Sequence, residues 1–386
     1  METSKWKKFD LDLMFIVFVF MIVSCVSIYS AQKFLPYEEN FALKQSVWFI
    51  GGMILTSIVY YFDFEQLRRL SPYLFGFGVL LLAFLMVAPS SIAPIIKGTK
   101  AWFSIPGFGS LQPSEFMKVF LILFLAHVIQ SHNEKHEERT LSSDSFLLFK
   151  VVSFTLIPLL LILKQPDAGT GMVIVSIMIG MIFISGINHY ILFLFSFLGV
   201  SGIASLVWIF IYKTDVLLKI LSQYQLDRIY SWLDPFGNGQ GIGYQLRLSI
   251  LASGSGKMMG KGFNDGEVAV PEAHSDFIFT VIGEEFGFIG SSVVLCLYFL
   301  LIYKIITIVL RNKGHYEILI GAGVISMLTF HIFENVGMVI GLVPITGIPL
   351  PMLSYGGSSV LGTILALSII NNVSATTNVY MFESKE

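Results

Sequence analysis

The 386-residue sequence has little charge. Only 13% of its residues are Asp, Glu, Lys or Arg, whereas soluble domains carry about 25%. Hydrophobic residues make up 55%, and the mean hydropathy is +0.76. These values exclude an ordinary soluble globular protein. The formal net charge of -2 gives no basic surplus for binding to phosphate backbones, so nucleic acid is not an expected partner.

Cysteine is also scarce, with only Cys25 and Cys296 in the whole chain. Both lie inside apolar runs, which excludes a disulfide framework and a cysteine-based zinc site. We expect both side chains to be buried in the protein core.

Long apolar runs are what the sequence does contain. Ten of them approach the roughly 20 residues that a membrane-spanning helix needs. The runs are residues 13–31, 45–62, 73–92, 113–130, 146–163, 168–187, 190–212, 277–303, 318–342 and 354–371. The sequence therefore predicts an all-α integral membrane protein with about ten transmembrane helices in a single domain, 1–386.

The first run resembles a secretory signal because Lys5, Lys7 and Lys8 precede it. Its 19 uncharged residues, 13–31, exceed the usual apolar core of about 7–15 residues, and no small-residue cleavage site follows. We therefore expect an uncleaved first span.

The distribution of Lys and Arg among the loops predicts the orientation. With a cytoplasmic N-terminus, the inner segments hold Lys5, Lys7, Lys8, Arg68, Arg69, Lys135, Arg139, Lys150, Lys304, Arg311, Lys313 and Lys385. The short outer segments hold only Lys33, Lys44, Lys97, Lys100 and Lys164. Because basic residues favour the cytoplasmic side, both termini are expected there in a multi-pass protein.

The largest connection, residues 213–276, joins spans seven and eight and is rich in glycine and polar residues. This composition favours an extracellular cap built of short amphipathic or re-entrant helices. Its Gly-Lys pairs lack the spacing of a phosphate-binding loop. In the loop 131–144, His132 and His136 have a metal-ligand spacing, but a solvated cytoplasmic loop is the preferred interpretation.

Charged residues at membrane depth are costly and are candidates for function. Here they gather at the outer ends of the spans, as Glu115 and Lys118, Asp167, and Asp276. Each has a structural alternative. Glu115 and Lys118, spaced i and i+3, can form an ion pair that locks one helix, and either aspartate can cap the helix that it precedes. Trp102 in the same outer region can be an interfacial anchor.

A second set of polar residues lies deeper in the predicted spans eight and nine. Its members are Glu284, Glu285, His331, Glu334 and Asn335. We expect a buried polar network that joins the two spans. A proton path through the same residues is the alternative.

An acidic site on the outer face limits the chemistry that is available. No ATP is present outside the cell, so bond formation there needs a substrate that is already activated, such as a sugar on a lipid diphosphate. Asp276, at the membrane boundary, can accept the proton of an attacking hydroxyl. Cations would neutralise the leaving diphosphate. The candidates are Lys97, Lys100, Lys118, Arg228 and Arg247.

Five segments resemble the SEDS proteins of the RodA, FtsW and SpoVE type. They are 98–103 (GTKAWF), 112–118 (QPSEFMK), 165–170 (QPDAGT), 271–279 (PEAHSDFIF) with GEE at 283–285, and 341–359 (GLVPITGIPLPMLSYGGSS). The segments span most of the chain, and the RodA branch, which acts in cell elongation, is the most similar.

This resemblance implies a ten-span enzyme of the bacterial cell membrane that polymerises lipid II into β-1,4-linked peptidoglycan on the outer leaflet. Asp276 matches the essential aspartate of the family, which is the candidate general base for an inverting transfer that releases undecaprenyl diphosphate. Other residues match positions at the outer cavity or in the signature segments around it. They are Trp102, Glu115, Lys118, Asp167, His274 and Ser354.

The resemblance also implies partners. These are lipid II, membrane lipid, a class B penicillin-binding protein that cross-links the product, and the cell-elongation complex. The resemblance does not assign a definite cofactor, and assistance by a divalent cation is left open. Two rival functions remain at this point, a lipid II flippase and a non-catalytic scaffold of the wall-synthesis complex.

Overall fold

The computed structural model describes residues 9–35, 39–96, 98–105, 109–136, 138–213, 223–237, 241–312 and 314–383. Within these ranges, nine helices are long and apolar enough to cross a membrane. A further apolar helix, α6, has 17 residues. At 1.5 Å per residue it is about 26 Å long, close to the thickness of a hydrocarbon core of about 30 Å. The prediction of an all-α membrane protein with about ten crossings is confirmed.

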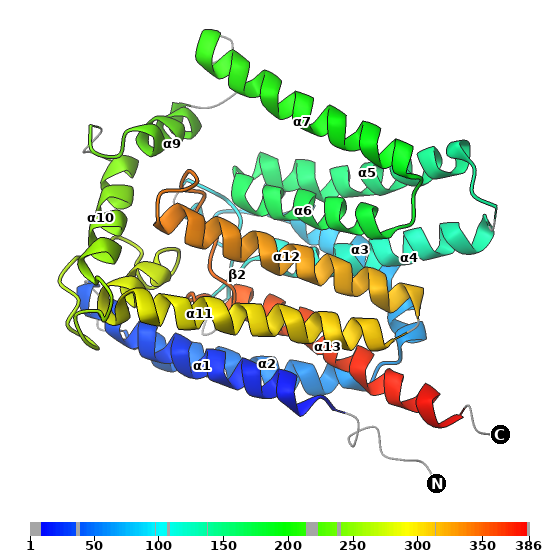
Figure 1. The fold of residues 1–386 in the computed structure, drawn as a ribbon, viewed down its shortest axis with the longest axis horizontal. Coiled ribbons are helices and arrows are strands. Elements are labelled where there is room, and N and C mark those ends of the chain that lie inside the picture. Colours follow the sequence, from blue (N-terminus) through cyan, green and yellow to red (C-terminus); the bar gives the residue numbers. More distant parts are fainter. Residues whose placement is uncertain are drawn as a thin grey trace.

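The crossing helices lie roughly parallel to the long axis of the molecule, and successive helices run in opposite directions (Figure 1). They are α1 (Leu11–Ala31), α2 (Phe41–Tyr60), α3 (Phe64–Val87), α4 (Pro113–Lys135), α5 (Leu141–Lys164), α6 (Ala168–Ile184), α7 (His189–Tyr212), α11 (Ile278–Arg311), α12 (His315–Val339) and α13 (Gly357–Glu383). The smaller elements are η2 (Gln32–Phe34), β1 (Phe103–Ile105), β2 (Gly109–Leu111), α9 (Gln223–Leu233) and α10 (Ile242–Ser255).

The two ends of the bundle differ in the connecting segments that lie there. Among the described residues, the cap end holds the long connections from α3 to α4, α7 to α11 and α12 to α13, and the short ones from α1 to α2 and α5 to α6. The other short connections lie at the terminal end, with the start of α1 and the end of α13 (Figure 1). In the long connection, α9 and α10 are the short helices expected there. The small antiparallel hairpin of β1 and β2, paired Phe103 to Leu111, was not predicted from the sequence.

Short polar side chains begin several helices as the capping rules require. Asp10 caps α1 and Asn40 caps α2 through bonds to backbone N–H groups. At α3, Asp63 and Gln66 form a capping box, and the helix continues through Pro72. The predicted start of this span at residue 73 is therefore wrong, because the cap lies ten residues earlier and one missing N–H does not end the helix.

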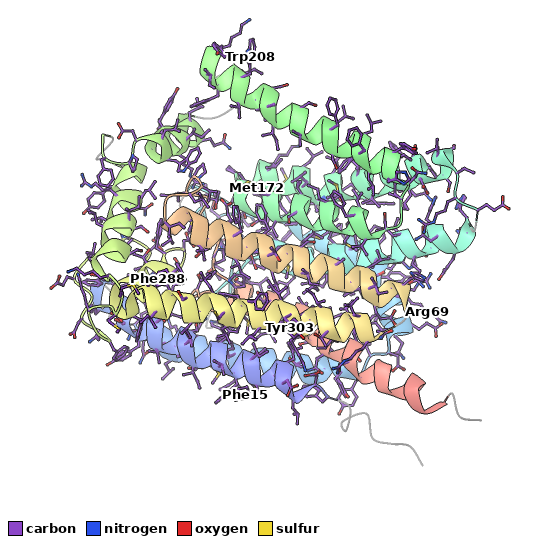
Figure 2. All side chains as sticks on the ribbon, in the orientation of Figure 1. Phe15, Arg69, Met172, Trp208, Phe288 and Tyr303 are labelled. Carbon is purple, nitrogen blue, oxygen red and sulfur yellow. The ribbon has the colours of Figure 1, made fainter. Side chains whose placement is uncertain are left out.

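The helices are buried to very different degrees. Most described residues of α13 and α4 are buried, whereas α7 has no buried residue. Figure 2 shows Phe15 on α1 and Trp208 on α7 at the edge of the bundle, and both of them, like Tyr303 on α11, are more than half exposed. Such apolar exposure suits a lipid-facing surface, so the interior of the bundle is formed by α4, α12 and α13.

Small residues and paired polar groups allow the inner helices to approach one another closely. A side chain at Gly52 of α2 would collide with Ile364 of α13, and one at Gly323 of α12 would collide with Ile122 of α4. The hydroxyls of Thr56 and Ser368 are 2.7 Å apart between α2 and α13. Close packing of this kind is typical of helix contacts inside membranes.

The helix α11 is broken at Gly287, which has φ 64° and ψ -158°. The freed backbone groups pair with the segment just after α10. The N–H groups of Lys261 and Gly262 donate to the carbonyls of Glu284 and Glu285, and the N–H of Phe288 donates to the carbonyl of Lys257. The predicted span 277–303 is therefore two helical pieces, and irregular backbone is tolerated because neighbouring protein satisfies it.

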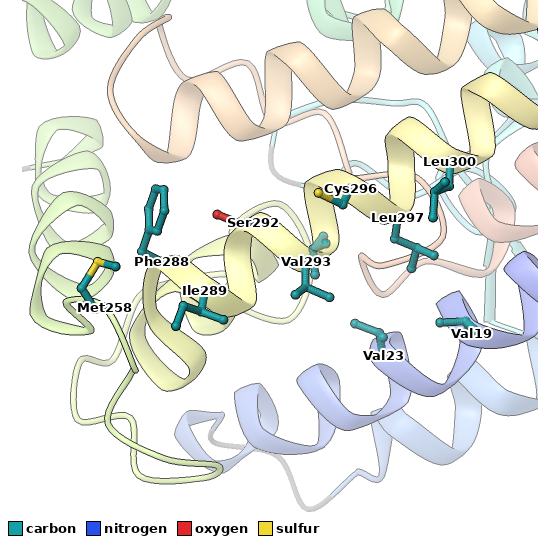
Figure 3. Close-up of a pocket in the computed structure, with 11 residues that line it drawn as sticks. Val19, Val23, Met258, Phe288, Ile289, Ser292, Val293, Cys296, Leu297 and Leu300 are labelled. Atoms are coloured by element: carbon teal, nitrogen blue, oxygen red, sulfur yellow. The ribbon is translucent and has the colours of Figure 1, made fainter.

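An apolar groove of about 460 Å³ lies between α1 and the second piece of α11 (Figure 3). Val19 and Val23 form one wall, and Phe288, Val293 and Cys296 form part of the other (Figure 3). Cys296 is exposed and Cys25 is half-buried, so the expectation that both cysteines are core residues is wrong. An apolar run that faces lipid looks the same in sequence as one that faces the core.

Candidate active site

Asp276 lies at the cap end, in the turn that leads into α11. The Asn335 side chain of α12 holds the backbone of this turn, because its Nδ2 donates to the carbonyl of Asp276 at 2.7 Å and to that of Ile348 at 2.8 Å. A Cβ added to Gly347 would lie 3.4 Å from Asp276 Oδ2. The half-buried Asp276 side chain therefore faces the connection 340–356, and one residue, the N-cap Phe277, separates it from the helix.

The segment before Asp276 is fastened to the turn around Ser354. Ser354 Oγ donates to the carbonyl of Ser275 at 2.6 Å and accepts from Leu350 N at 2.7 Å. Tyr355 N donates to the carbonyl of His274 at 2.9 Å, and burial raises the pKa of the Tyr355 phenol. Two sequence-predicted residues, His274 and Ser354, thus position the backbone on the N-terminal side of Asp276.

A polar side chain of α2 supports the same turn and was missed by the sequence analysis. Gln45 is buried, and its Nε2 donates to the carbonyl of Ser354 at 3.0 Å and to Ser24 Oγ of α1 at 3.1 Å. The only signal in the sequence is a glutamine at the start of an apolar run. The contacts of the Gln45 side chain are set by tertiary packing.

Glu115 and Lys118 form a buried ion pair on α4. Both carboxylate oxygens of Glu115 lie 2.9 Å from Lys118 Nζ, and the two residues are only 3% and 2% exposed. Lys118 Nζ also lies 3.0 Å from Nε2 of His331 on α12, and His331 Nδ1 lies 3.3 Å from the carbonyl of Pro349. This cluster ties α4 to α12 and to the connection 340–356. It agrees with the structural alternative for Glu115 and Lys118, an ion pair that holds helices in place.

Asp167 caps α6, as the structural alternative required. Its carboxylate accepts from the backbone N–H of Thr170 at 3.0 Å, from the Thr170 hydroxyl at 2.8 Å and from Gln112 Nε2 at 3.1 Å. Two residues further on, Gly169 packs so closely against Ile348 that a side chain there would collide with it. Asp167 thus positions the first turn of α6 against the connection that faces Asp276.

The predicted basic residues are spread over the cap end. Arg228 of α9 donates to the carbonyl of Thr346 at 3.2 Å, next to the Gly347 that Asp276 faces. Arg247 of α10 lies over the Tyr244 ring, with 5.5 Å from its guanidinium carbon to the ring centre. Lys100 donates to the carbonyl of Ala88 at the end of α3.

Two further predicted residues lie on the 88–112 connection. Trp102 is half-buried just before β1. Lys97 lies outside the described residues. Among the described residues, Arg228 is the predicted cation that donates a hydrogen bond directly to the segment beside Asp276.

Glu334 of α12 adds a second buried acid near this segment. It precedes Asn335 on α12 and is 6% exposed. Among the described residues, no group of three or more His, Cys, Asp and Glu side chains is arranged to hold a metal ion.

Glu284 and Glu285 do not join the polar residues of α12, so the predicted network between spans eight and nine is wrong. Glu284 accepts from Lys261 Nζ at 2.8 Å and from Glu267 N at 2.9 Å. The carboxylate of Glu285 contacts the Ser30 hydroxyl of α1. The break at Gly287 turns the first piece of α11 toward residues 257–268, and the hydrogen bond that Lys261 donates to Glu284 raises the pKa of Lys261.

Sequence comparison finds relatives over nearly the full length of the chain. The sequence model of the FTSW_RODA_SPOVE family, described as "Cell cycle protein", matches residues 7–379. Stage V sporulation protein E of Bacillus subtilis is 32% identical over 382 residues, which cover 96% of this chain and 98% of the relative. A probable peptidoglycan glycosyltransferase FtsW of Trichlorobacter lovleyi is 33% identical over 376 residues, which cover 95% and 93%.

Solved structures share the fold. A chain from a study described as "Structural coordination of polymerization and crosslinking by a peptidoglycan synthase complex" aligns with a TM-score of 0.78 and 27% identity, covering 96% of this chain and 98% of that one. The rod shape determining protein RodA of Thermus thermophilus aligns with a TM-score of 0.66 and 26% identity, covering 95% and 96%. The likeness therefore includes both the bundle and the cap.

Proposed function

This chain belongs to the FTSW_RODA_SPOVE family, and from that premise we propose that it is a peptidoglycan glycosyltransferase. It polymerises lipid II into β-1,4-linked glycan during cell elongation and releases undecaprenyl diphosphate. Relatives named peptidoglycan glycosyltransferase support the reaction class. The fold shared with a rod shape determining protein supports the elongation role.

In the proposed orientation, the cap end faces the outside of a bacterial cell membrane and the terminal end faces the cytoplasm. The distribution of basic residues supports it, since positive charge collects on the cytoplasmic side. Among the described residues, the terminal end carries Arg68, Arg69, Lys135, Arg139, Lys150, Lys304 and Arg311. Asp276 then lies on the side where lipid II is consumed.

Asp276 acts as the general base. Its carboxylate takes the proton of the acceptor 4-hydroxyl, the oxygen bonds to the anomeric carbon of the donor, and the bond from that carbon to the diphosphate breaks. Attack opposite the leaving group inverts the configuration. The observation that carries this assignment is the half-buried carboxylate on a backbone held from both sides, by Asn335 and by Ser354 acting on Ser275. A fixed base contributes about 10²- to 10⁴-fold to a rate.

The other predicted site residues assist in two ways. Cations at the cap end, with Arg228 nearest by its bond beside Gly347, balance the charge of the leaving diphosphate. Lys97, Lys100 and Arg247 are further candidates for this role. The remaining residues, Trp102, Glu115, Lys118, Asp167, His274 and Ser354, hold the walls of the cavity in place.

The proposed partner is a class B penicillin-binding protein that cross-links the glycan within the cell-elongation complex. A chain of similar fold comes from a peptidoglycan synthase complex that couples polymerization to crosslinking, which supports this partnership.

The test uses the purified protein together with its penicillin-binding partner and labelled lipid II. We expect glycan polymer from the native protein and none from an equally stable Asp276→Ala variant. Equal polymer from both would overturn the assignment of the base. Movement of lipid II across vesicle membranes without polymer formation would show that the protein is a flippase and not a glycosyltransferase.

The described contacts do not favour a flippase path through Lys118. Glu115 binds this lysine, which is therefore not available to a diphosphate that passes through the bundle.

A further inference from the structure

A second pocket opens at the cap end, and Asp276 is not among the residues that line it. It has a volume of about 190 Å³ and lies between the end of α3, residues 95, 98 and 100 of the next connection, and the turn from α5 to α6. Gly98 forms part of its wall with φ +79°, and a Cβ there would meet no atom within 4 Å. The pocket is therefore open above this glycine.

Within the described part of the chain, the charged residues that line this pocket are two lysines. Lys100 donates to backbone carbonyls of Ala88 and Met86 at the end of α3, which places its ammonium without cancelling its charge. Lys164 is exposed in the last turn of α5. No acidic side chain in the described part of the chain forms an ion pair with either lysine. Asp167, the nearest acid in sequence to Lys164, is engaged by Thr170 and Gln112.

Apolar side chains border the same pocket. Ile95 is 68% exposed and Met86 is 38% exposed. They lie where a crossing helix ends, at the level of lipid headgroups in a membrane. A ligand that matches this pocket has an anionic head and an apolar tail.

We propose that the pocket between Lys100 and Lys164 binds the phosphate or diphosphate group of a membrane lipid. Two cations without acidic partners match a group that carries about two negative charges. Lys100 bonds to the end of α3 and Lys164 lies in the last turn of α5, so the ends of two helices bring both ammonium groups to one pocket. The ammonium of each lysine retains hydrogen-bond donors for a ligand.

The pocket is connected to the active site through the first turn of α6. Pro166 lines the pocket, and Gly169, three residues later, packs against Ile348 of the connection that faces Asp276. A lipid phosphate in the pocket would therefore contact the same turn that packs against this connection. The binding proposal itself does not depend on the reaction assigned to Asp276.

The test is a binding titration of the full-length protein in a mild detergent. Farnesyl diphosphate supplies a prenyl diphosphate that is soluble enough to titrate, and sodium diphosphate supplies the head without the tail. We expect farnesyl diphosphate to bind at least tenfold more tightly than sodium diphosphate, and each of Lys100→Ala and Lys164→Ala to weaken its binding about tenfold. Lys164→Arg should retain most of the affinity.

Lys44→Ala is the matched control, because Lys44 is also a cap-end lysine but is paired with Glu39 at 2.6 Å. It should leave the affinity unchanged. Unchanged affinity in the Lys164→Ala variant, which removes an exposed side chain and should fold normally, would overturn the proposal. Equal binding of sodium diphosphate and farnesyl diphosphate would overturn the lipid part of it. Loss of polymerisation with intact farnesyl diphosphate binding would affect only the proposed enzyme function.

Discussion

Glu115 and Asp276 are both carboxylates at the cap end, but the protein treats them in opposite ways. Glu115 is buried and both of its oxygens are bound by Lys118 at 2.9 Å. Asp276 is half-buried, and Asn335 holds its backbone carbonyl at 2.7 Å. A buried acid that is bound by a lysine stabilises the bundle, whereas an acid with a fixed backbone and a partly exposed side chain can act on a substrate.

Charge alone therefore does not identify a functional acid in this bundle. The cost of burying a charge is offset at Glu115 by a lysine and, through it, by His331. The same contacts tie α4 to α12, so the ion pair also supports the connection that faces Asp276. Substitutions can separate the stabilising role of the Glu115–Lys118 pair from the support of Asp276, and they are expected to differ in their effect on stability.

The Lys118→Met substitution should have the largest effect. It leaves the Glu115 carboxylate buried without a counter-charge, and loss of one partner of a buried pair costs about 3–5 kcal/mol. Thermal unfolding in detergent should show a large drop in the midpoint. An unchanged midpoint would contradict the structural role of the pair. Lys44→Met, which breaks the exposed pair with Glu39, is the control and should cost at most about 1 kcal/mol.

The double variant Glu115→Leu/Lys118→Met should be more stable than Lys118→Met alone. Replacing both members of a buried pair by apolar side chains is often neutral within a few kcal/mol, since no charge remains to be desolvated. We expect the double variant to recover at least about half of the loss of the single variant. A double variant as unstable as Lys118→Met would show that the pair contributes through its shape instead of its charge.

Ser354→Ala tests the support on the side of Asp276. It leaves the carbonyl of Ser275 and the N–H of Leu350 without their hydroxyl partner, which costs about 1–3 kcal/mol in a buried place. We expect polymerisation to fall as well, because Ser275 precedes Asp276. Ser205→Ala on the exposed helix α7 is the control and should stay within about 0.5 kcal/mol. A Ser354→Ala variant with native stability would contradict the proposed role of the Ser354 hydroxyl in holding Ser275 and Leu350.

Asp167→Ala should have the smallest effect of the four, about 1 kcal/mol, because it removes the N-cap of α6. Asp167→Asn retains a capping oxygen and should keep most of the stability. Thermal unfolding of the two variants measures the difference. Equal losses in both would mean that the negative charge matters at this position and the cap does not.

Much of the fold could be predicted because burial in lipid leaves a simple signal. Nearly every crossing helix corresponds to an apolar run, and the long connection with α9 and α10 follows from its glycine and polar composition. Helix starts were less accurate, as at α3, where the Asp63 capping box lies before the apolar run. A cap is a local polar pattern that hydropathy does not detect.

The candidate site could be predicted only in part. Asp276, Ser354 and His274 come from two segments that the structure brings together. The interaction partners of Glu284 and Glu285 were predicted wrongly, because the break at Gly287 reorients the first piece of α11. A glycine inside an apolar run gives no sign of that break. The pairing that stabilises it comes from backbone groups of residues 257–262, which sequence patterns do not reveal.

The most direct test of the central claim compares Asp276→Asn with Asp276→Glu in polymerisation of lipid II, both as equally folded proteins. Asparagine keeps the size of the side chain and removes the base, whereas glutamate keeps a base on a longer side chain. We predict that the asparagine variant loses at least about 10²-fold in rate and that the glutamate variant retains more activity. An asparagine variant that polymerises lipid II at the native rate would contradict the account.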